Sequence, residues 1–167
     1  RLFLYYNMYI FQNPQNLPES ALYYSSILIM NAFRSSSPDE IKEKWFDPQV
    51  SDIQHEFKNT IISGLQDANV SVRNVCSTII ASIAFIEVTW QELCGMLINN
   101  IKAEQGSYLT LGSITCLAEL FSLPVIQQDA PLPDFMMELI MLLSYAIREE
   151  SLVPLSRIDA CSALIRV

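Results

Sequence analysis

Histidine, cysteine and paired carboxylates are the side chains of this chain whose chemistry could support catalysis or metal binding. His55 is the only histidine among 167 residues, and no nucleophile or metal ligand stands at a motif spacing from it. On the helix expected there, it lies roughly 160–200° around the axis from Ile53 and Phe57, toward solvent. Glu149 and Glu150 are adjacent charges at a helix end, which is typical of a solvated face. We therefore expect no enzyme activity, no metal site and no cofactor.

The cysteines do not form a metal or disulfide pattern. They stand 18, 22 and 45 residues apart, at Cys76, Cys94, Cys116 and Cys161. None belongs to a Cys-x-x-Cys pair, and each lies within an apolar helical pattern. The chain also has no Gly-rich phosphate loop, no Gly-x-Ser-x-Gly and no His-Glu-x-x-His. The expectation is four reduced core thiols in a reducing compartment.

The composition excludes several further classes. Hydrophobic residues make up 51% and charged residues 17%, which excludes intrinsic disorder. The net charge of −8 and the pI of about 4.5 argue against direct nucleic-acid binding and suit basic partners. The charge-free runs 20–33 and 105–118 are 14 residues long, so they favour buried helices over membrane insertion. No secretory signal is indicated, and the start at Arg1 instead of Met suggests a trimmed fragment.

Apolar spacing is helical along almost the whole chain, and only 4 of the residues are glycine. Val50, Ile53, Phe57 and Ile61, at steps of 3, 4 and 4, form one stripe of this kind. Helices are expected to begin near residues 2, 18, 49, 69, 90, 107, 133 and 154. The segment 39–44 is expected to be a charged linker with at most a helical turn.

The expected helices alternate between a narrow-stripe and a wide-stripe type. Helices of the first type begin 47, 41 and 43 residues apart, and those of the second type 51, 38 and 47 apart. A helix-pair period of about 40–47 residues is typical of HEAT and armadillo arrays. The prediction is an all-α fold, a right-handed α-α superhelix of about four helix pairs. Residues 1–167 would be a single HEAT-repeat array with repeats at about 1–34, 49–87, 90–123 and 133–167.

One turn favours HEAT repeats specifically. Asp67 precedes Val72 and Arg73, with the small residue Cys76 one turn later. HEAT repeats often carry an aspartate in the turn between their helices and a Val-Arg in the second helix. The aspartate can accept backbone N–H bonds at the helix start, and the arginine can reach acidic or carbonyl groups of the next repeat. Both residues are therefore expected to form a ladder within the stack.

Four segments and one tryptophan carry a more specific signature. They are residues 29–33 (IMNAF), Trp45 after a Ser-rich turn and a charged linker, and residues 57–65 (FKNTIISGL), 83–88 (IAFIEV) and 90–93 (WQEL). In order and spacing they resemble the I-K-N-x-[LF], V-K-N-x-[VL]-L-x-x-L and I-A-x-x-E-[IL]-P…W-P-E-L segments of the importin-β (karyopherin-β) nuclear transport receptors. The resemblance continues more weakly to residue 165 and corresponds to about the second through fifth HEAT repeats. Met30, the proline-free loop Val88-Thr89, Leu111 and Thr115 depart from the family pattern.

This resemblance implies a transport cycle. Receptors of this family bind the small GTPase Ran in its GTP form through N-terminal repeats, and this binding releases cargo in the nucleus. They bind FG-repeat nucleoporins in apolar slots between neighbouring outer helices. The chain would therefore shuttle between cytoplasm and nucleus, while cargo or an importin-α-type adaptor would bind through missing C-terminal repeats.

The resemblance also suggests candidate residues. Those expected to face Ran, with solvated surface or inter-repeat hydrogen bonding as the alternative, are Asn31, Arg34, Asn74, Thr78, Thr115 and Arg157. The helix expected from Phe135 to Ile147 is apolar on most faces, so it is either buried by a following repeat or part of a nucleoporin slot. The slot would involve Leu139, Leu142 or Leu143.

Two other functions fit the same pattern. One is a HEAT-repeat scaffold subunit of a protein complex, without a GTPase switch. The other is an exportin-type karyopherin, because the N-terminal regions of importers and exporters are similar. The end of the second helix at Asn31, the Trp45 linker and the corner from Glu87 to Trp90 favour a transport receptor over a scaffold.

Overall fold

The computed structural model describes residues 2–13, 16–34, 38–48, 50–103, 107–122, 133–148 and 161. Its secondary structure in these ranges is entirely helical. The helices are α1 (Leu2–Gln12), α2 (Glu19–Arg34), α3 (Pro38–Trp45), α4 (Ser51–Ser63), the 3-10 turn η2 (Gly64–Gln66), α5 (Val70–Glu87), α6 (Trp90–Ala103), α7 (Tyr108–Phe121) and α8 (Pro133–Arg148). The predicted all-α class is therefore confirmed.

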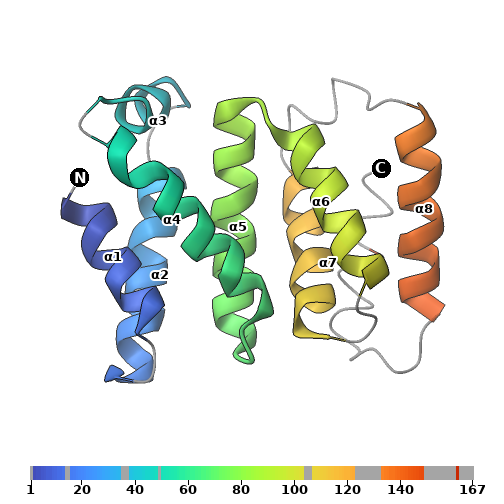
Figure 1. The fold of residues 1–167 in the computed structure, drawn as a ribbon, viewed down its shortest axis with the longest axis horizontal. Coiled ribbons are helices and arrows are strands. Elements are labelled where there is room, and N and C mark those ends of the chain that lie inside the picture. The colour runs from blue at the N-terminus through green and yellow to red at the C-terminus, as the bar shows by residue number, and fades with distance from the viewer. Residues whose placement is uncertain are drawn as a thin grey trace.

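The helices form two layers along the long axis of the molecule (Figure 1). A first layer contains α1, α4, α6 and α8, and a second layer contains α2, α5 and α7. Consecutive helices from opposite layers make the pairs α1–α2, α4–α5 and α6–α7, which lie side by side. Within the second layer, α5 packs against both α2 and α7.

Seven of the eight expected helices are confirmed, with starts close to the predicted residues. The prediction for residues 39–44 was wrong, because this segment belongs to the eight-residue helix α3. Pro38 begins α3, acidic Asp39 and Glu40 follow in its first turn, and lysines occupy its last turn, all of which stabilise a helix. The eighth expected helix, near 154–165, lies outside the described ranges.

Two helices, α5 and α7, begin with a side-chain cap. The Asn69 side chain accepts a hydrogen bond from the Ser71 amide (2.9 Å) at the start of α5, and the Ser107 hydroxyl accepts one from the Thr110 amide (3.2 Å) at the start of α7. Each cap satisfies a backbone donor that has no partner inside the helix. The two caps explain why α5 and α7 begin where they do.

Apolar stripes on the two layers meet in one continuous core. The predicted stripe of α4 is confirmed, since Val50, Ile53, Phe57 and Ile61 are all buried. The wider stripe of α5 reflects its place between α2 and α7. α5 is long and apolar enough to cross a membrane by length and composition, yet most of it is buried within the protein, as expected of a core helix.

The turn between α4 and α5 inserts against α7. A Cβ atom on Gly112 of α7 would overlap the Leu65 carbonyl oxygen and lie 2.9 Å from the carbonyl carbon. Only glycine permits this approach of backbone to helix. On the other side of the turn, a Cβ on Gly64 would overlap the Cys76 sulfur. Gly112 thus lets the second and third helix pairs meet at van der Waals distance, and Gly64 lets the turn pack closely against α5 of its own pair.

Asp67 and Arg73 lie in the same turn. The Asp67 carboxylate accepts a hydrogen bond from the Asn69 amide (2.7 Å), as predicted. The prediction for Arg73 was wrong in its acceptors: the guanidinium donates to the carbonyls of Asp67 (2.6 Å) and Ala68 (3.0 Å) in its own turn. Its link to the next pair is the Tyr108 ring, whose centroid lies 5.2 Å away.

Candidate binding cleft between α4 and α6

A cleft lies between α4 and α6 in the first layer, whereas α5 and α7 pack closely together in the second layer. It has a volume of about 360 Å³ and lies between α4, the C-terminal half of α5 and the start of α6. This volume is at the small end of the range of ligand sites, roughly 300–1,000 Å³. We call it the α4–α6 cleft. Its apolar lining is Ile61, Ile62, Ile80, Ile83, Ala84, Leu93 and Met96, and its polar lining is His55, Lys58, Asn59, Glu87, Thr89 and Glu92.

The walls come from two kinds of apolar residue. Ile61, Ile80 and Ile83 belong to the core stripes and are buried, so their contribution is a rigid floor. Ile62 and Met96 are half-buried and stand beside those stripes. A half-buried apolar side chain can still exchange water for a ligand, and the flexible Met96 thioether can adapt its shape. The cleft can therefore accept an apolar side chain.

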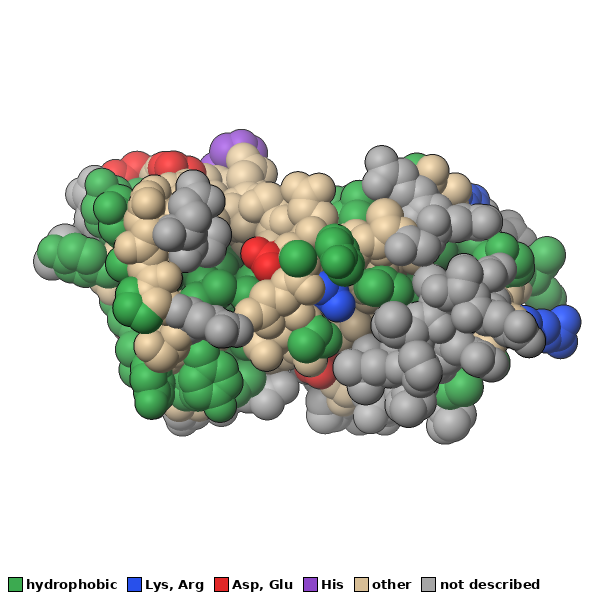
Figure 2. Space-filling view, turned by 90° about the horizontal axis from the view of Figure 1, so that it is seen from below, with side chains coloured by type: hydrophobic (Ala, Val, Ile, Leu, Met, Phe, Trp, Pro, Cys, Tyr) green, Lys and Arg blue, Asp and Glu red, His purple; other side chains and the backbone are tan. Residues whose placement is uncertain are grey.

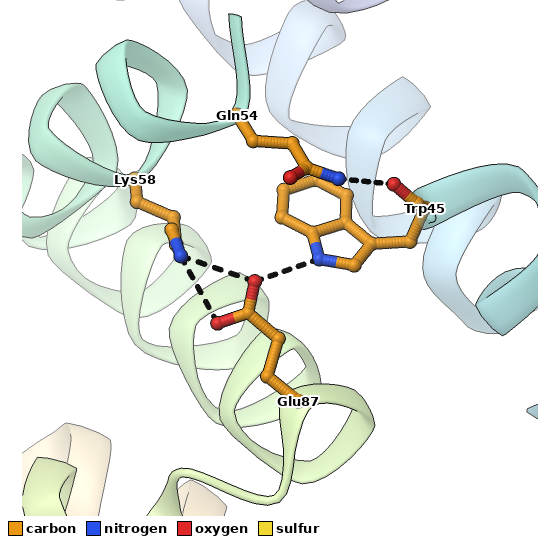
Figure 3. Close-up of polar contacts among 4 residues, drawn as sticks. All are labelled: Trp45, Gln54, Lys58 and Glu87. Atoms are coloured by element: carbon orange, nitrogen blue, oxygen red, sulfur yellow. Dashed lines mark hydrogen bonds and ion pairs between the residues drawn. The ribbon is translucent and has the colours of Figure 1, made fainter. Parts of the chain in front are cut away.

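A polar network joins α3, α4 and α5 beside the cleft (Figure 3), and two of its members, Lys58 and Glu87, belong to the cleft lining. Glu87, the last residue of α5, accepts a hydrogen bond from the Trp45 indole Nε1 at 2.8 Å. The Lys58 ammonium lies 3.1 Å from both carboxylate oxygens of Glu87. One carboxylate thereby joins α3, α4 and α5. The ion pair is only partly exposed, so solvent screens it less than it would a surface pair.

Trp45 is held on two further sides. Its ring meets Phe57 edge-on, with centroids 6.1 Å apart, in the geometry that aromatic pairs prefer. Its backbone carbonyl accepts a hydrogen bond from the Gln54 side chain. These contacts bury the indole almost completely. The network is thus a structural clamp that fixes α3 against α4 and sets one boundary of the cleft.

The corner between α5 and α6 has an uncommon backbone. Val88 has φ of 59°, the left-handed region that disfavours β-branched residues. This conformation ends α5 with the Thr89 amide bonded to the Ala84 carbonyl at 2.9 Å, a common way to satisfy helix ends. The turn sets Thr89 in the cleft lining beside Glu87, while the Val88 side chain is exposed.

Two of the charged residues in the cleft lining form an ion pair with each other, Lys58 and Glu87. Lys58 and Glu87 largely neutralise each other, and Glu92 and His55 are exposed at the margin. In the described part of the chain, no group of histidine, cysteine, aspartate and glutamate could hold a metal ion. The cleft can bury an apolar group of a ligand and form hydrogen bonds to it at the edge, so it is suited to binding.

The buried thiols stand apart from the cleft. Burial raises the pKa of Cys94 to about 12, and it raises the pKa values of Cys76 and Cys116 well above the ordinary range. All three thiols are fully buried and stay protonated at neutral pH, the state in which a thiol is a poor nucleophile. Cys161 is half-buried.

Five of the six residues suggested for Ran lie on three second-layer helices. Asn31 on α2 and Asn74 on α5 are exposed. Thr78, one turn after Asn74, is buried and donates its hydroxyl to the Asn74 carbonyl (3.1 Å). Thr115 on α7 is half-buried and donates to the Leu111 carbonyl. Among those suggested residues whose side chains the structure describes, the two asparagines are the exposed ones.

The other suggested residues are placed less fully. Arg34 and Leu139 lie on α2 and α8, but their side chains are outside the described set, and Arg157 is outside the described ranges. Leu142 is half-buried and Leu143 is fully buried on α8. Neither Leu142 nor Leu143 belongs to the lining of the α4–α6 cleft.

Sequence reasoning missed the cleft residues, although one signal was present. Ile62 is a second apolar residue beside Ile61, outside the regular stripe of an otherwise polar helix. Such a residue is typical of a surface that is only partly covered. Met96 on α6 carries the same signal, half-buried next to Leu97.

Comparisons with known proteins return no match. No protein-family model, no curated protein and no solved structure is similar to this chain.

Proposed function

We propose that this chain is part of a HEAT-repeat array of an importin-β-like nuclear transport receptor. In this proposal its second layer contacts Ran in the GTP form, and its α4–α6 cleft accepts a phenylalanine of an FG-repeat nucleoporin. The observation that carries the proposal is the stacking of helix pairs, close in the second layer and open in the first. Stacking of helix pairs on their neighbours is what a solenoid requires.

The cleft supports the nucleoporin part of the proposal. Its position between two neighbouring first-layer helices corresponds to the slots between outer helices that the resemblance implies. An FG repeat offers an isolated phenylalanine on a polar chain, and the cleft offers an isoleucine floor with a polar rim. Burial of a phenyl ring there contributes roughly 1.5–3 kcal/mol, which suits a weak and rapidly reversible contact.

The second layer supports the Ran part. Asn31 and Asn74 are exposed on neighbouring helices, so one partner can meet both amides. These two side chains are open to a partner, whereas the Thr78 side chain is buried and its hydroxyl bonds to the Asn74 carbonyl of its own helix. Cargo or an adaptor would bind elsewhere, and the receptor would shuttle between cytoplasm and nucleus.

A scaffold function is the second candidate, and the clamp is equally compatible with it. Trp45 and Glu87, which contribute to the family resemblance, use their polar atoms on each other. Residues with that role are needed by a HEAT scaffold as much as by a receptor. An exportin would contain the same clamp.

The first experiment measures binding of the chain to Ran loaded with GTP or GDP. The expected result is binding that depends on GTP and weakens at least about tenfold in Asn31→Ala/Asn74→Ala, about 1.4 kcal/mol. Asn59→Ala, an exposed asparagine on the first layer, is the matched control. Equal binding to both nucleotide forms, or no binding, would favour the scaffold.

The cleft is tested separately with an FxFG peptide. Ile62→Glu/Met96→Glu places two charges in the apolar lining and should abolish peptide binding while leaving Ran binding unchanged. Phe46→Glu/Val70→Glu changes two exposed apolar residues outside the cleft and should bind as the parent chain does. Peptide binding that survives the cleft variant would place the slot elsewhere.

A further inference from the structure

The α4–α6 cleft combines its apolar floor with a negatively charged margin. Among the described lining residues, Lys58 is the only lysine or arginine, and it is bonded to Glu87. Glu92 also belongs to the lining, and its side chain is exposed in the first turn of α6. A ligand that enters the cleft therefore meets a net negative charge on the side of α6.

The two helices that form the walls carry the same sign of charge. Together with Glu87, helices α4 and α6 contain four carboxylates and two lysines. The second lysine, Lys102, lies ten residues after Glu92 in the last turn of α6, which is about 15 Å away along the helix axis. In Figure 2, acidic side chains and the histidine lie at the upper edge of the molecule, and this edge belongs to the first layer because the only histidine, His55, is on α4. A cation is therefore attracted to the part of the first layer that contains the cleft.

Glu87 contributes an acceptor within the cleft. Its Oε1 accepts hydrogen bonds from the Trp45 indole (2.8 Å) and from Lys58 (3.1 Å), and its Oε2 accepts from Lys58 (3.1 Å). A carboxylate has about four acceptor positions. Glu87 can thus accept one further hydrogen bond, at Oε2, from an N–H group of a ligand.

The spacing along α6 matches that of an extended peptide. Glu92 and Met96 both line the cleft, and they lie one helical turn apart, which is about 5.4 Å along the axis. An extended peptide advances about 3.3–3.6 Å per residue. If an apolar side chain of the peptide packs against Met96, a lysine or arginine one or two residues away therefore reaches the Glu92 carboxylate.

We propose that the α4–α6 cleft selects peptide segments in which a lysine or arginine stands within two residues of the apolar anchor, and that Glu92 determines this preference. The inference rests on the proposed function, because it concerns the sequence around the phenylalanine that enters the cleft. The cation pairs with Glu92 and can donate to Oε2 of Glu87. An aspartate or glutamate at the same place in the peptide is repelled.

Three FxFG peptides of equal length test the proposal by fluorescence anisotropy with the parent chain. They carry serine, lysine or glutamate at the residue on each side of the motif. At about 50 mM salt the lysine peptide should bind about two- to fivefold more tightly than the serine peptide, as expected of an exposed ion pair, and the glutamate peptide more weakly. At about 1 M salt, where the screening length is about 3 Å, the three affinities should converge.

Two variants locate the preference. Glu92→Gln should reduce the advantage of the lysine peptide to below about 1.5-fold and leave the affinity for the serine peptide within about twofold. Glu43→Gln changes an exposed glutamate on α3, outside the cleft lining, and is the control for net charge, so it should retain the full advantage. A preference that survives Glu92→Gln, or that falls equally in Glu43→Gln, would overturn the proposal.

The serine peptide separates failure of this inference from failure of the proposed slot. If it binds the parent chain as tightly as the lysine peptide does, and Ile62→Glu/Met96→Glu abolishes its binding, the slot stands and the charge preference is overturned. If none of the peptides binds, or if the serine peptide still binds that cleft variant, the proposed slot fails and the charge preference fails with it.

Discussion

The second and third helix pairs meet differently in the two layers. Between α5 and α7 the backbone of η2 touches Gly112, and the Ser77 hydroxyl donates to the carbonyls of Arg73 (2.8 Å) and Gly112 (3.3 Å). Between α4 and α6 a cleft of about 360 Å³ remains. The same two pairs are thus tightly joined on one side and open on the other.

Side-chain size accounts for this difference. Small residues face each other between α5 and α7, namely Ser77, Gly112 and Cys116, all nearly or fully buried. The α4–α6 side carries longer side chains such as Lys58, Ile62 and Met96. Helix separation follows the size of the residues at the contact. The comparison teaches that the cleft results from the close approach in the other layer.

The largest expected effect on stability comes from a substitution that separates α7 from η2, where the two helix pairs are in close contact. Gly112→Ala places a methyl group against the Leu65 carbonyl, and neither backbone can move without separating α7 from η2. We expect a loss of about 3 kcal/mol in the free energy of unfolding, the upper range for overpacking. Urea unfolding followed by circular dichroism measures it.

Gly95→Ala is the matched control for this prediction. Gly95 also lies within a helix, but a Cβ there meets nothing within 4 Å. Alanine should stabilise that helix by about 0.5–1 kcal/mol. If both variants shift stability in the same direction, close contact is not what glycine 112 provides.

The second-largest effect on stability is expected from loss of the clamp of Trp45, Lys58 and Glu87, which lies beside the α4–α6 cleft. Glu87→Ala leaves the buried Trp45 indole N–H and the Lys58 ammonium without their shared acceptor. The expected destabilisation is about 2 kcal/mol, since a buried donor is left unsatisfied. Glu87→Gln retains an oxygen acceptor and should lose about half as much. Equal losses in the two variants would contradict the role of the indole hydrogen bond.

A third effect concerns pH and the buried thiol of α6. The folded pKa of Cys94, about 12, lies above its ordinary value of 9.0. The resulting stability is fully present below pH 9 and is lost as the pH rises from 9 toward 12. At pH 10 the loss from this thiol is about 1.4 kcal/mol.

Unfolding measured at pH 8 and pH 10 in the parent chain and in Cys94→Ala tests this effect. The alanine variant should lose less stability between the two pH values, whatever its stability at pH 8. The same pH dependence in both proteins would mean that Cys94 is not protected from ionisation.

The smallest effect is expected at the corner of the open side. Val88→Gly relieves a left-handed backbone that disfavours valine and should stabilise the protein by about 1 kcal/mol. The exposed side chain leaves little packing to lose. A thermal unfolding scan measures the gain, and a drop in the midpoint would show that the corner does not need a positive φ.

The helices were predictable because most of them are long and strongly periodic. The stripe from Val50 to Ile61 and the capping residues Asn69 and Ser107 define their elements locally. The helix α3 was missed because its apolar pattern consists of only Ile41 and Trp45. The proline at the start of α3, the acidic residues in its first turn and the lysines in its last turn stabilise this helix although its apolar stripe is weak.

The cleft could not be predicted in the same way. Glu87 meets partners 29 and 42 residues earlier in the chain, and no local pattern states that these residues touch. The width of the cleft depends on how closely α5 and α7 approach, which in turn depends on Gly112. Exposure of Asn31 and Asn74, and burial of Thr78, likewise follow from the packing of neighbouring helices.

The insertion of Leu65 against Gly112 has a consequence for the order in which the protein loses its structure. In an array whose repeats contact one another only through their flat faces, the repeats can unfold one at a time. Here the turn of one pair is part of the packing surface of the next, and Arg73 rests on Tyr108 across the same boundary. Helices α4 to α7 should therefore exchange their amide protons as one cooperative block, while α1 can fray from it.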